Sequence, residues 1–431
     1  MREMKDSGVA WIGVIPQDWE IVRTKSLYCS AKEIAGDRAD DFERLALTLN
    51  GVIKRSKEDS VGLQPEKFSG YQILKKGELV FKLIDLENVA TSRVGLSPYT
   101  GIVSPAYIVL SKQSRAKDLV VRYSMYHFLS MWQREIFNQM GDNGVRSSLN
   151  AKELLNIPHP FPSIYEQKRI VTFLDAQCAK IDAVLEKTRA SIEEYKKLKQ
   201  AVITQAVTKG IHGDRPMKDS GIEWIGDIPA GVPISRVGLH FDIVLGKMLC
   251  SAPVDDNYTL ESYYCAADVH FEGLSNGEKK KMWFSPDEKE QYCVKNGDLL
   301  VVEGGAGAGG CAIAVSTDVP IYIQNSIMIV RSKGISNIRY LRYLLECLVK
   351  KGYIDVVCNK ATIPHFTKAK LANVPFIVFS QSEQEEIAEY LNEKCAGIDA
   401  LIVKKQQYLT EIENYKKSLI YEYVTGKKEV V

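Results

Sequence analysis

One stretch of the sequence has the spacing of a nucleotide-binding loop. Gly305, Gly307 and Gly310 satisfy the pattern G-x-G-x-x-G directly after the strand-like run DLLVV at residues 298–302. Glycines at this spacing allow a tight turn and bring the backbone close to a pyrophosphate, which a following helix N-terminus binds. Here the loop is followed by CAIAV from Cys311, an apolar run with no helix signal. We therefore expect a glycine-rich loop between two strands, either a plain turn or a place where the backbone can approach a ligand closely.

Other catalytic signatures are missing. A methyltransferase that acts on a flipped adenine needs an Asn/Asp-Pro-Pro-Tyr/Phe motif, and the chain has no Pro-Pro pair. It also has no Gly-Lys-Ser/Thr phosphate loop for ATP. Pro286-Asp287 is not followed by an acid-x-Lys element at the distance that a nuclease needs, so we expect a solvated turn at residues 285–290. His159 and His365 lie near junctions and are expected to pack, so no catalytic residue is predicted.

The composition argues against a membrane span and a zinc site. The apolar runs are far shorter than the roughly 18 to 20 residues that a membrane helix needs. No apolar segment follows Arg2 and Lys5, so no secretory signal is expected and the cytoplasm is the predicted location. The nine cysteines form no Cys-x-x-Cys pair, which predicts reduced thiols and no metal site. The net charge of +2 neither favours nor excludes a nucleic-acid partner.

The chain is a tandem repeat. MKDSGVAWIG at residues 4–13 returns as MKDSGIEWIG at residues 217–226, with eight of ten positions identical. EQKRIVTFLDAQCAKID from Glu166 returns as EQEEIAEYLNEKCAGID from Glu383, with eight of seventeen positions identical. The stretches between these similar ends differ, so each unit is expected to be a common scaffold that presents its own surface.

Each unit starts with a body of mixed secondary structure and ends in a long helix. Short strand-like runs separated by turn residues, and then one helical stretch, make up each body. In the first body these runs are residues 44–49, 77–83 and 107–110, with the helix at 118–138. In the second body they are residues 263–269, 297–302 and 327–330, with the helix near 338–350. The predicted boundaries are 1–157 for the first body, 158–213 for the first long helix, 214–374 for the second body and 375–431 for the second long helix.

The long helices carry start signals and a heptad stripe. Ser163 with Glu166, and Ser380 with Glu383, form S-x-x-E capping boxes, in which the serine caps the helix and the glutamate reaches back to the cap. Mostly apolar residues then recur at alternating steps of four and three, which is typical of a coiled coil. The predicted seam residues are Leu174, Ile181, Leu185, Ile192, Tyr195 and Val202 in the first helix, and Leu391, Ile398, Ile402, Leu409, Ile412 and Leu419 in the second. Lys199 and Lys416 are polar seam positions at matching places and are expected to fix the register.

Two near-equivalent units in one chain imply a pseudo-twofold molecule. Each helix of forty-odd residues would be about 60 Å long, and its apolar stripe is most simply covered by the other helix. Parallel helices would put both bodies at one end, whereas antiparallel helices would separate and invert them. Duplex DNA has dyads perpendicular to its axis, so two inverted bodies on a spacer can meet two half-sites in equivalent orientations.

These motifs, in their doubled order, resemble the specificity subunit of type I restriction-modification enzymes along essentially the whole chain. The resemblance rests on WIGxIP at residues 11–16 and 224–229, GIVSPAYIVL at 101–110 and AADVHFEG at 266–273. It also rests on the two EQxxI helix starts, the ID pairs within them and the endings VTKG and VTGK. It implies an α+β fold, with two mixed α/β target recognition domains in tandem, separated by two long helices in an antiparallel coiled coil.

The resemblance implies a DNA-reading subunit without its own catalysis. Each body would bind one half of a bipartite, asymmetric site on double-stranded DNA, and the helices would set the gap between the halves. The helices would also dock two methyltransferase subunits, which use S-adenosylmethionine to methylate adenine. Restriction and translocase subunits that use ATP and Mg would join the full complex, and no cofactor or membrane is expected for this chain itself.

Candidate DNA contacts lie in polar loops that follow strands, because phosphates are bound by Lys, Arg, Ser, Thr, Asn and backbone amides. In the first body the candidates are Asn50, Lys54, Arg55, Lys57, Arg146 and Ser147. In the second body they are the expected loop cluster Lys279, Lys280 and Lys281, with Lys360 and Thr362. Two other functions stay open: a nucleotide-dependent transferase built on the loop at residues 305–310, and a coiled-coil scaffold that makes no DNA contact.

Overall fold

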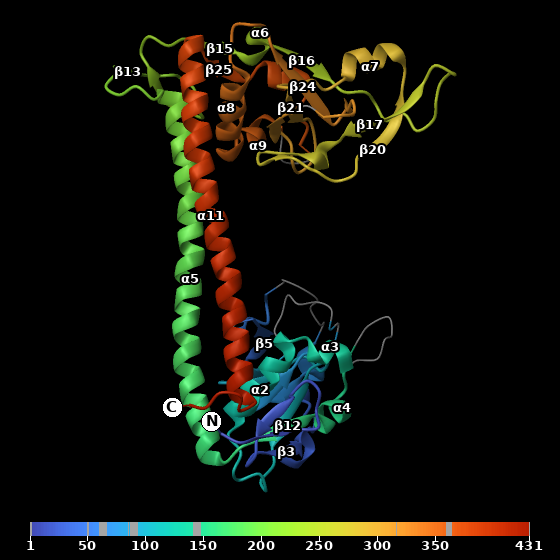
Figure 1. The fold of residues 1–431 in the computed structure, drawn as a ribbon, viewed down its shortest axis with the longest axis vertical. Helices are drawn as coiled ribbons and strands as arrows, with labels where there is room; N and C mark the ends of the chain where they lie inside the picture. The colour runs from blue at the N-terminus through green and yellow to red at the C-terminus, as the bar shows by residue number, and fades with distance from the viewer. Residues whose placement is uncertain are drawn as a thin grey trace. The chain divides into compact units, whose positions relative to one another are not determined.

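The computed structural model describes residues 2–49, 51–59, 67–84, 86, 94–140, 148–315, 317–358 and 364–430. The chain divides into two compact units (Figure 1). The first unit is Met1–Arg189 with Gln407–Val431, and the second is Ala190–Gln406. Each unit therefore contains one body, part of the first long helix and part of the second.

The first body is built on two four-stranded sheets, in the orders β6-β5-β10-β7 and β4-β11-β8-β9. Its strands are β1 (Met4–Asp6), β2 (Val14–Pro16), β3 (Glu20–Arg23), β4 (Tyr28–Cys29), β5 (Arg44–Thr48), β6 (Gly51–Arg55), β7 (Gln72–Leu74), β8 (Leu79–Phe81), β9 (Val94–Leu96), β10 (Gly101–Val103), β11 (Ile108–Lys112) and β12 (Pro158–Phe161). Its helices are α1 (Thr24–Leu27), η1 (Gly36–Asp41), η2 (Phe68–Gly70), α2 (Val121–Gln133), α3 (Ile136–Met140) and α4 (Ala151–Asn156).

Strand alternation gives the first body two layers of core. Leu79 and Phe81 of β8 point into a cluster with Phe128 of α2, whereas Val80 between them packs with Leu45 of β5. Successive side chains of a strand point to opposite faces, so one strand serves both layers. The helical stretch expected at 118–138 is present as α2 and α3.

The second body has a four-stranded sheet in the order β16-β24-β21-β22 and a three-stranded sheet in the order β20-β17-β23. Its strands are β13 (Met217–Asp219), β14 (Asp227–Pro229), β15 (Ile234–Arg236), β16 (Phe241–Leu245), β17 (Thr259–Tyr264), β18 (Val269–His270), β19 (Gly273–Leu274), β20 (Lys280–Phe284), β21 (Leu299–Val302), β22 (Cys311–Ile313), β23 (Tyr322–Ile323), β24 (Ile327–Ser332) and β25 (Pro375–Ile377). Its helices are α6 (Val237–His240), η3 (Ala266–Asp268), α7 (Pro286–Tyr292), α8 (Ile338–Lys350), α9 (Tyr353–Val357) and α10 (Lys368–Ala372).

The same alternation organises the second body. Leu299 and Val301 of β21 pack in the cluster that contains Leu344 of α8, whereas Leu300 and Val302 pack in a separate cluster on the other face. The turn expected at residues 285–290 is wrong, because these residues start α7. Ser285 accepts from the amide of Glu288, whose carboxylate returns to the Ser285 amide, and Pro286 stands at the first helical position.

The two long helices begin where the sequence signals place them. Helix α5 is Ile164–Lys209 and α11 is Gln381–Val424. The hydroxyls of Ser163 and Ser380 accept the amides of Glu166 and Glu383, as expected of N-caps. The glutamates, however, do not complete the boxes. Glu166 binds Arg2 and the indole of Trp19, and Glu383 binds Arg215 at 2.7 Å, so each helix start is tied to the beginning of a repeat instead.

The helices run antiparallel within each unit (Figure 1). In the first unit Lys416 Nζ of α11 binds Asp182 Oδ1 of α5 at 2.5 Å, and in the second unit Lys199 Nζ of α5 binds Asp399 Oδ2 of α11 at 2.7 Å. These four residues occupy matching positions of the repeat. The two ion pairs are therefore equivalent, with the roles of the two helices exchanged. Every residue of the expected seam is buried or half-buried.

The bodies are attached to the helices by equivalent hydrogen bonds. Each attachment uses a tyrosine hydroxyl on a helix-end carbonyl, a second tyrosine hydroxyl on an Asp or Asn, and a glutamine that caps the body's helix. In the first unit these bonds are Tyr123 to Val424 O (2.9 Å), Tyr126 to Asp175 (2.6 Å) and Val120 N to Gln167 (2.8 Å). In the second they are Tyr340 to Val207 O (3.0 Å), Tyr343 to Asn392 (2.8 Å) and Asn337 N to Gln384 (2.8 Å). The repeat therefore preserves the attachment, while the bodies differ in their strands and loops.

Candidate nucleic-acid interface

The basic residues expected to bind DNA in the first body lie on and after the β5–β6 hairpin. Lys54 and Arg55 are at the end of strand β6, opposite Leu45 and Arg44, rather than in the loop that the sequence predicted. Strand β6 extends this far because the buried Val52 holds it against β5, with which it pairs. Lys57 lies in the turn that follows. The candidates Asn50, Arg146 and Ser147 lie outside the described residues.

Each of these three cations has an acidic partner. Lys54 Nζ lies 2.5 Å from Glu43, Arg55 Nε lies 2.7 Å from Asp59, and Lys57 Nζ lies 3.2 Å from Asp40. Hydrogen bonds to Glu43 and Asp59 raise the pKa of Lys54 and Arg55. A phosphate that binds here must therefore compete with carboxylates that already hold the cations.

The lysine cluster of the second body is divided between two environments. Lys279 is only 10% exposed, and its Nζ contacts Asp268 Oδ1 (3.1 Å), Ser275 O (2.7 Å), Ser275 Oγ (3.0 Å) and Gly277 O (3.0 Å). Burial raises the pKa of Asp268, but hydrogen bonds from Cys265, Ser275 and Lys279 outweigh it, so the net shift is downward. Lys279 thus stabilises its own loop. A phosphate would have to displace these bonds to reach it.

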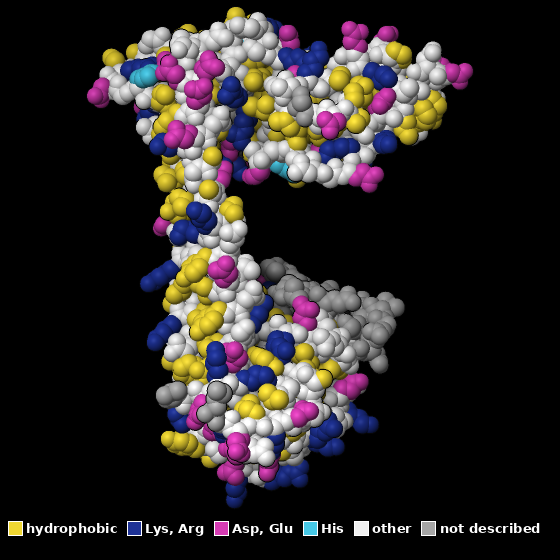
Figure 2. Space-filling model, in the orientation of Figure 1, with side chains coloured by type: hydrophobic (Ala, Val, Ile, Leu, Met, Phe, Trp, Pro, Cys, Tyr) yellow, Lys and Arg dark blue, Asp and Glu magenta, His cyan; other side chains and the backbone are white. Residues whose placement is uncertain are grey.

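Lys280 and Lys281 start strand β20, so the expected loop cluster is corrected here as well. They lie opposite Tyr263 and Ser262 of β17, and both side chains are exposed. Within the part of the chain that the structure describes, neither has an acidic partner. Lys360 and Thr362 lie outside that part. On the face that Figure 2 shows, basic and acidic side chains are interspersed on each unit.

The glycine-rich stretch is a hairpin. Strand β21 pairs antiparallel with β22, and Val302 N donates to Gly310 O at 2.8 Å to close the loop. The expectation of a loop between strands is confirmed. No helix follows to bind a pyrophosphate, so the geometry does not support the transferase alternative.

Comparisons with known proteins agree along the chain. Residues 272–411 match the family model described as "Type I restriction modification DNA specificity domain". The MjaVIII specificity subunit of a type I restriction enzyme of Methanocaldococcus jannaschii is 25% identical, over 96% of this chain and 94% of its own length. The putative MjaX specificity subunit of the same organism is 23% identical, over 97% and 96%. Along nearly its whole length the chain is similar to specificity subunits of type I restriction-modification enzymes.

A solved structure has the same fold. A chain from work on complex assembly and conformational transition of the type I R-M system superposes with a TM-score of 0.72 at 17% identity. The superposition covers 96% of this chain and 99% of the other. The family model that matches the second unit is described as a DNA specificity domain, which is a DNA-recognition module. In the described ranges no helix is long and apolar enough to cross a membrane, and no group of three or more His, Cys, Asp or Glu side chains could hold a metal ion.

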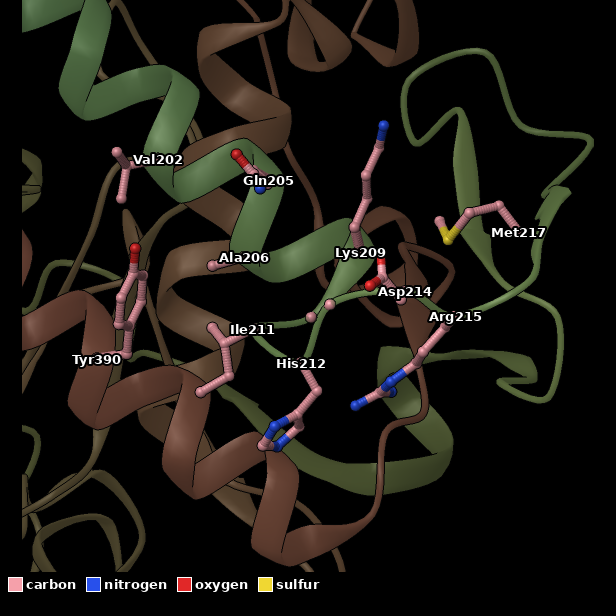
Figure 3. Close-up of a pocket in the computed structure, with 12 residues that line it drawn as sticks. Val202, Gln205, Ala206, Lys209, Ile211, His212, Asp214, Arg215, Met217 and Tyr390 are labelled. Atoms are coloured by element: carbon pink, nitrogen blue, oxygen red, sulfur yellow. The ribbon is translucent and has the colours of Figure 1, made fainter.

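The sequence did not reveal the charged junction at the C-terminal end of α5. A cavity of about 380 Å³ lies there, lined by Lys209 of α5, the linker after it and Tyr390 of α11 (Figure 3). The linker is tied to α11 by His212 to Glu386 at 2.8 Å and by Arg215 to Glu383. Because His212 and Arg215 each contact a carboxylate of α11, the junction holds the linker against this helix.

His365 was expected to pack and is instead 61% exposed, whereas His159 is fully buried as expected. The motifs TIPHF and IPHPF place His365 and His159 near junctions between a body and a long helix, and neither motif carries a signal for which face of its segment is covered. His365 lies against the glycine-rich hairpin, where an isolated bridge joins it to Gly304.

Proposed function

We propose that this specificity subunit reads a bipartite, asymmetric site on double-stranded DNA, one half with each body. The observation that carries the proposal is the equivalent attachment of two different bodies, through Tyr123 in the first unit and Tyr340 in the second. Each body is bound to the start of one long helix and the end of the other, with the two helices exchanged between the units, and we expect this exchange to match the dyads of duplex DNA. Since the bodies differ in their loops, the two half-sites are expected to differ.

We further propose that the long helices set the gap between the half-sites and dock two methyltransferase subunits. Large apolar side chains outside the seam support docking, because exposed apolar surface marks protein interfaces. On α5 and α11 these are Val184, Leu198, Leu401, Val403, Tyr408 and Tyr415. The partners would supply S-adenosylmethionine, ATP and Mg, with restriction subunits in the full complex, and the chain itself would need no cofactor. The complex would work in the cytoplasm, where the DNA is.

The methylome tests this function directly. The chain would be expressed with its neighbouring methyltransferase, and N6-methyladenine would be mapped by single-molecule sequencing. We expect one asymmetric bipartite motif with a fixed gap that disappears when this chain is deleted. A motif that survives the deletion, or no motif at all, would overturn the proposal and favour a scaffold that makes no DNA contact.

Lys280 and Lys281 are expected to bind phosphate, and Lys279 is not. Replacing both Lys280 and Lys281 with Ala should weaken DNA binding about tenfold at physiological salt and reduce the salt slope of log affinity by about two, since each phosphate contact contributes about 0.9. The measurement is fluorescence anisotropy on the cognate duplex, with the methyltransferase bound, across a salt series.

Two controls separate phosphate contact from general charge and from folding. The double variant Lys218→Ala/Lys295→Ala removes two exposed lysines elsewhere in the same unit and should change the slope little. Lys279→Ala should lower thermal stability, because it leaves Asp268 buried without its cation. An unchanged salt slope in the Lys280/Lys281 variant would exclude both residues as phosphate contacts.

A further inference from the structure

The tip of the glycine-rich hairpin has no side chain larger than a methyl group. Residues 304–310 read Gly-Gly-Ala-Gly-Ala-Gly-Gly. At the base of the hairpin, close packing within the protein explains the glycines. A Cβ on Gly309 would lie 2.9 Å from Ile354 and Val349, and one on Gly310 would lie 2.9 Å from Gly307 O.

At the tip, no close contact within the protein requires Gly307 to be a glycine. Its nearest neighbour would lie 3.9 Å from an added Cβ, and its φ is not in the left-handed region, so the chain itself would accept a side chain there. Gly307 and Ala306 are exposed. A side-chain-free tip at this position suits the close approach of another molecule.

The tip also offers backbone donors. The amide of Gly305 donates to Pro364 O at 3.1 Å, and the amide of Ala308 donates to Gly305 O at 3.1 Å. Between them, the amides of Ala306 and Gly307 have no hydrogen-bond partner among the described residues. Two neighbouring exposed N–H groups can bind a phosphate oxygen, as backbone amides do in protein–DNA complexes.

His365 is held beside this tip by the hairpin itself. Phe366 N donates to Glu303 O at 2.6 Å, and His365 Nδ1 lies 3.2 Å from Glu303 Oε2. A Cβ on Gly304 would lie 3.1 Å from His365 Nδ1, so the glycine makes room for the ring. The carbonyl of His365 accepts from Lys370 Nζ at 2.7 Å, which fixes the backbone as well.

The contact with Glu303 indicates which nitrogen of the His365 ring donates a hydrogen bond and which accepts one. A carboxylate only accepts, so Nδ1 carries the proton that it donates to Glu303. In the neutral ring Nε2 is then an acceptor, and it has no partner within the described part of the chain. An acceptor on an exposed and fixed ring can take a hydrogen bond from the amino group of adenine or cytosine in the major groove.

We propose that residues 305–307 and His365 form one DNA-reading element of the second body. The amides of Ala306 and Gly307 bind a backbone phosphate, and His365 Nε2 accepts from a base amino group of the second half-site. Glu303 is the positioning residue, because it orients the ring and touches no DNA. The inference rests on the proposed function and names residues that carry it out.

The test compares the affinity of variant complexes for the cognate duplex with their affinity for duplexes mutated in one half-site. His365→Ala is expected to weaken cognate binding about tenfold or more, the usual range for losing a base contact, and to relax discrimination at one position of the second half-site only. Gly307→Val is expected to weaken binding similarly, because its side chain meets the DNA and nothing in the protein. Glu303→Gln is expected to relax the same base position with a smaller loss of affinity.

Matched controls come from the same unit. His212 is also an exposed histidine paired with a glutamate, so His212→Ala should leave binding and both half-sites unchanged. Gly231 likewise has open space around its Cβ position, so Gly231→Val should also leave DNA binding unchanged. If His365→Ala does not fold, as judged by thermal melting, Gly307→Val decides.

Cognate binding and discrimination at the second half-site that are unchanged in both Gly307→Val and His365→Ala would overturn the proposal. A shift at the first half-site would do so too. Failure of the wild-type complex to recognise a bipartite site is a different outcome, since it would overturn the proposed function itself.

Discussion

Lowering the pH from about 7 to about 5 is expected to destabilise the first unit more than the second, in which the histidine with a lowered pKa, His240, is only half-buried. The first unit has two fully buried histidines, His127 and His159, with ring centroids 4.6 Å apart. Burial lowers the pKa of His159 to about 4 and, together with the neighbouring His159, lowers the pKa of His127 well below its usual value. The second unit has Leu344 and Phe376, both buried, at the matching positions.

The direction follows from where the protons bind. The unfolded chain has histidines of ordinary pKa, near 6.5, so below that pH it binds more protons than the folded unit does. The free energy of unfolding is therefore highest above about pH 6.5 and decreases as the pH falls towards 4. For His159 alone the loss is about 3 kcal/mol at the end of this range, because each pKa unit corresponds to about 1.4 kcal/mol.

Hydrogen exchange measures this within one molecule. Amides of α2 should lose protection between pH 7 and pH 5, whereas amides of α8, which has no histidine, serve as the internal control. His159→Phe introduces the residue found at the matching position of the second unit, Phe376. It is expected to make the protection of the α2 amides depend less on pH. Equal loss of protection in α2 and α8 would contradict the role of the histidine pair.

The helical scaffold could be predicted because its sequence signals are local and occur in both repeats. Ser163 and Ser380 mark the starts of α5 and α11 by an interaction that spans three residues, and the sequence contains all of it. The matching positions of Lys199 and Lys416 likewise indicated polar seam contacts. Their partners Asp399 and Asp182 needed the antiparallel pairing, which the resemblance supplied and the periodicity alone did not.

The site was harder to predict because its chemistry depends on distant partners. Lys279, Lys280 and Lys281 are alike in the sequence, yet Asp268 and Ser275 engage the first, while β17 turns the other two into an exposed strand edge. His365 shows the same limitation. Its exposure and its contact with Glu303 depend on a bridge between segments far apart in the chain.

Leu391→Ala is expected to have the largest effect of a single change on the second unit. Leu391 of α11 is fully buried, and it belongs to the cluster that joins both helices to α8 and the sheet. Truncating a buried leucine leaves a cavity and costs about 2 to 5 kcal/mol. Leu401→Ala on the same helix is the matched control, since Leu401 is 43% exposed and should cost less than about 0.5 kcal/mol.

The matching leucine-to-alanine substitution in each unit tests whether the long helices support the two bodies separately or together. Leu174 occupies the matching position in the first unit and is also fully buried, so Leu174→Ala should expose α2 to hydrogen exchange and Leu391→Ala should expose α8. Under the proposed function methylation needs both half-sites, so either variant should lower methylation of the whole motif near the melting temperature. If Leu391→Ala and Leu401→Ala destabilise the protein equally, the helix does not support the second body in the way that its buried cluster indicates.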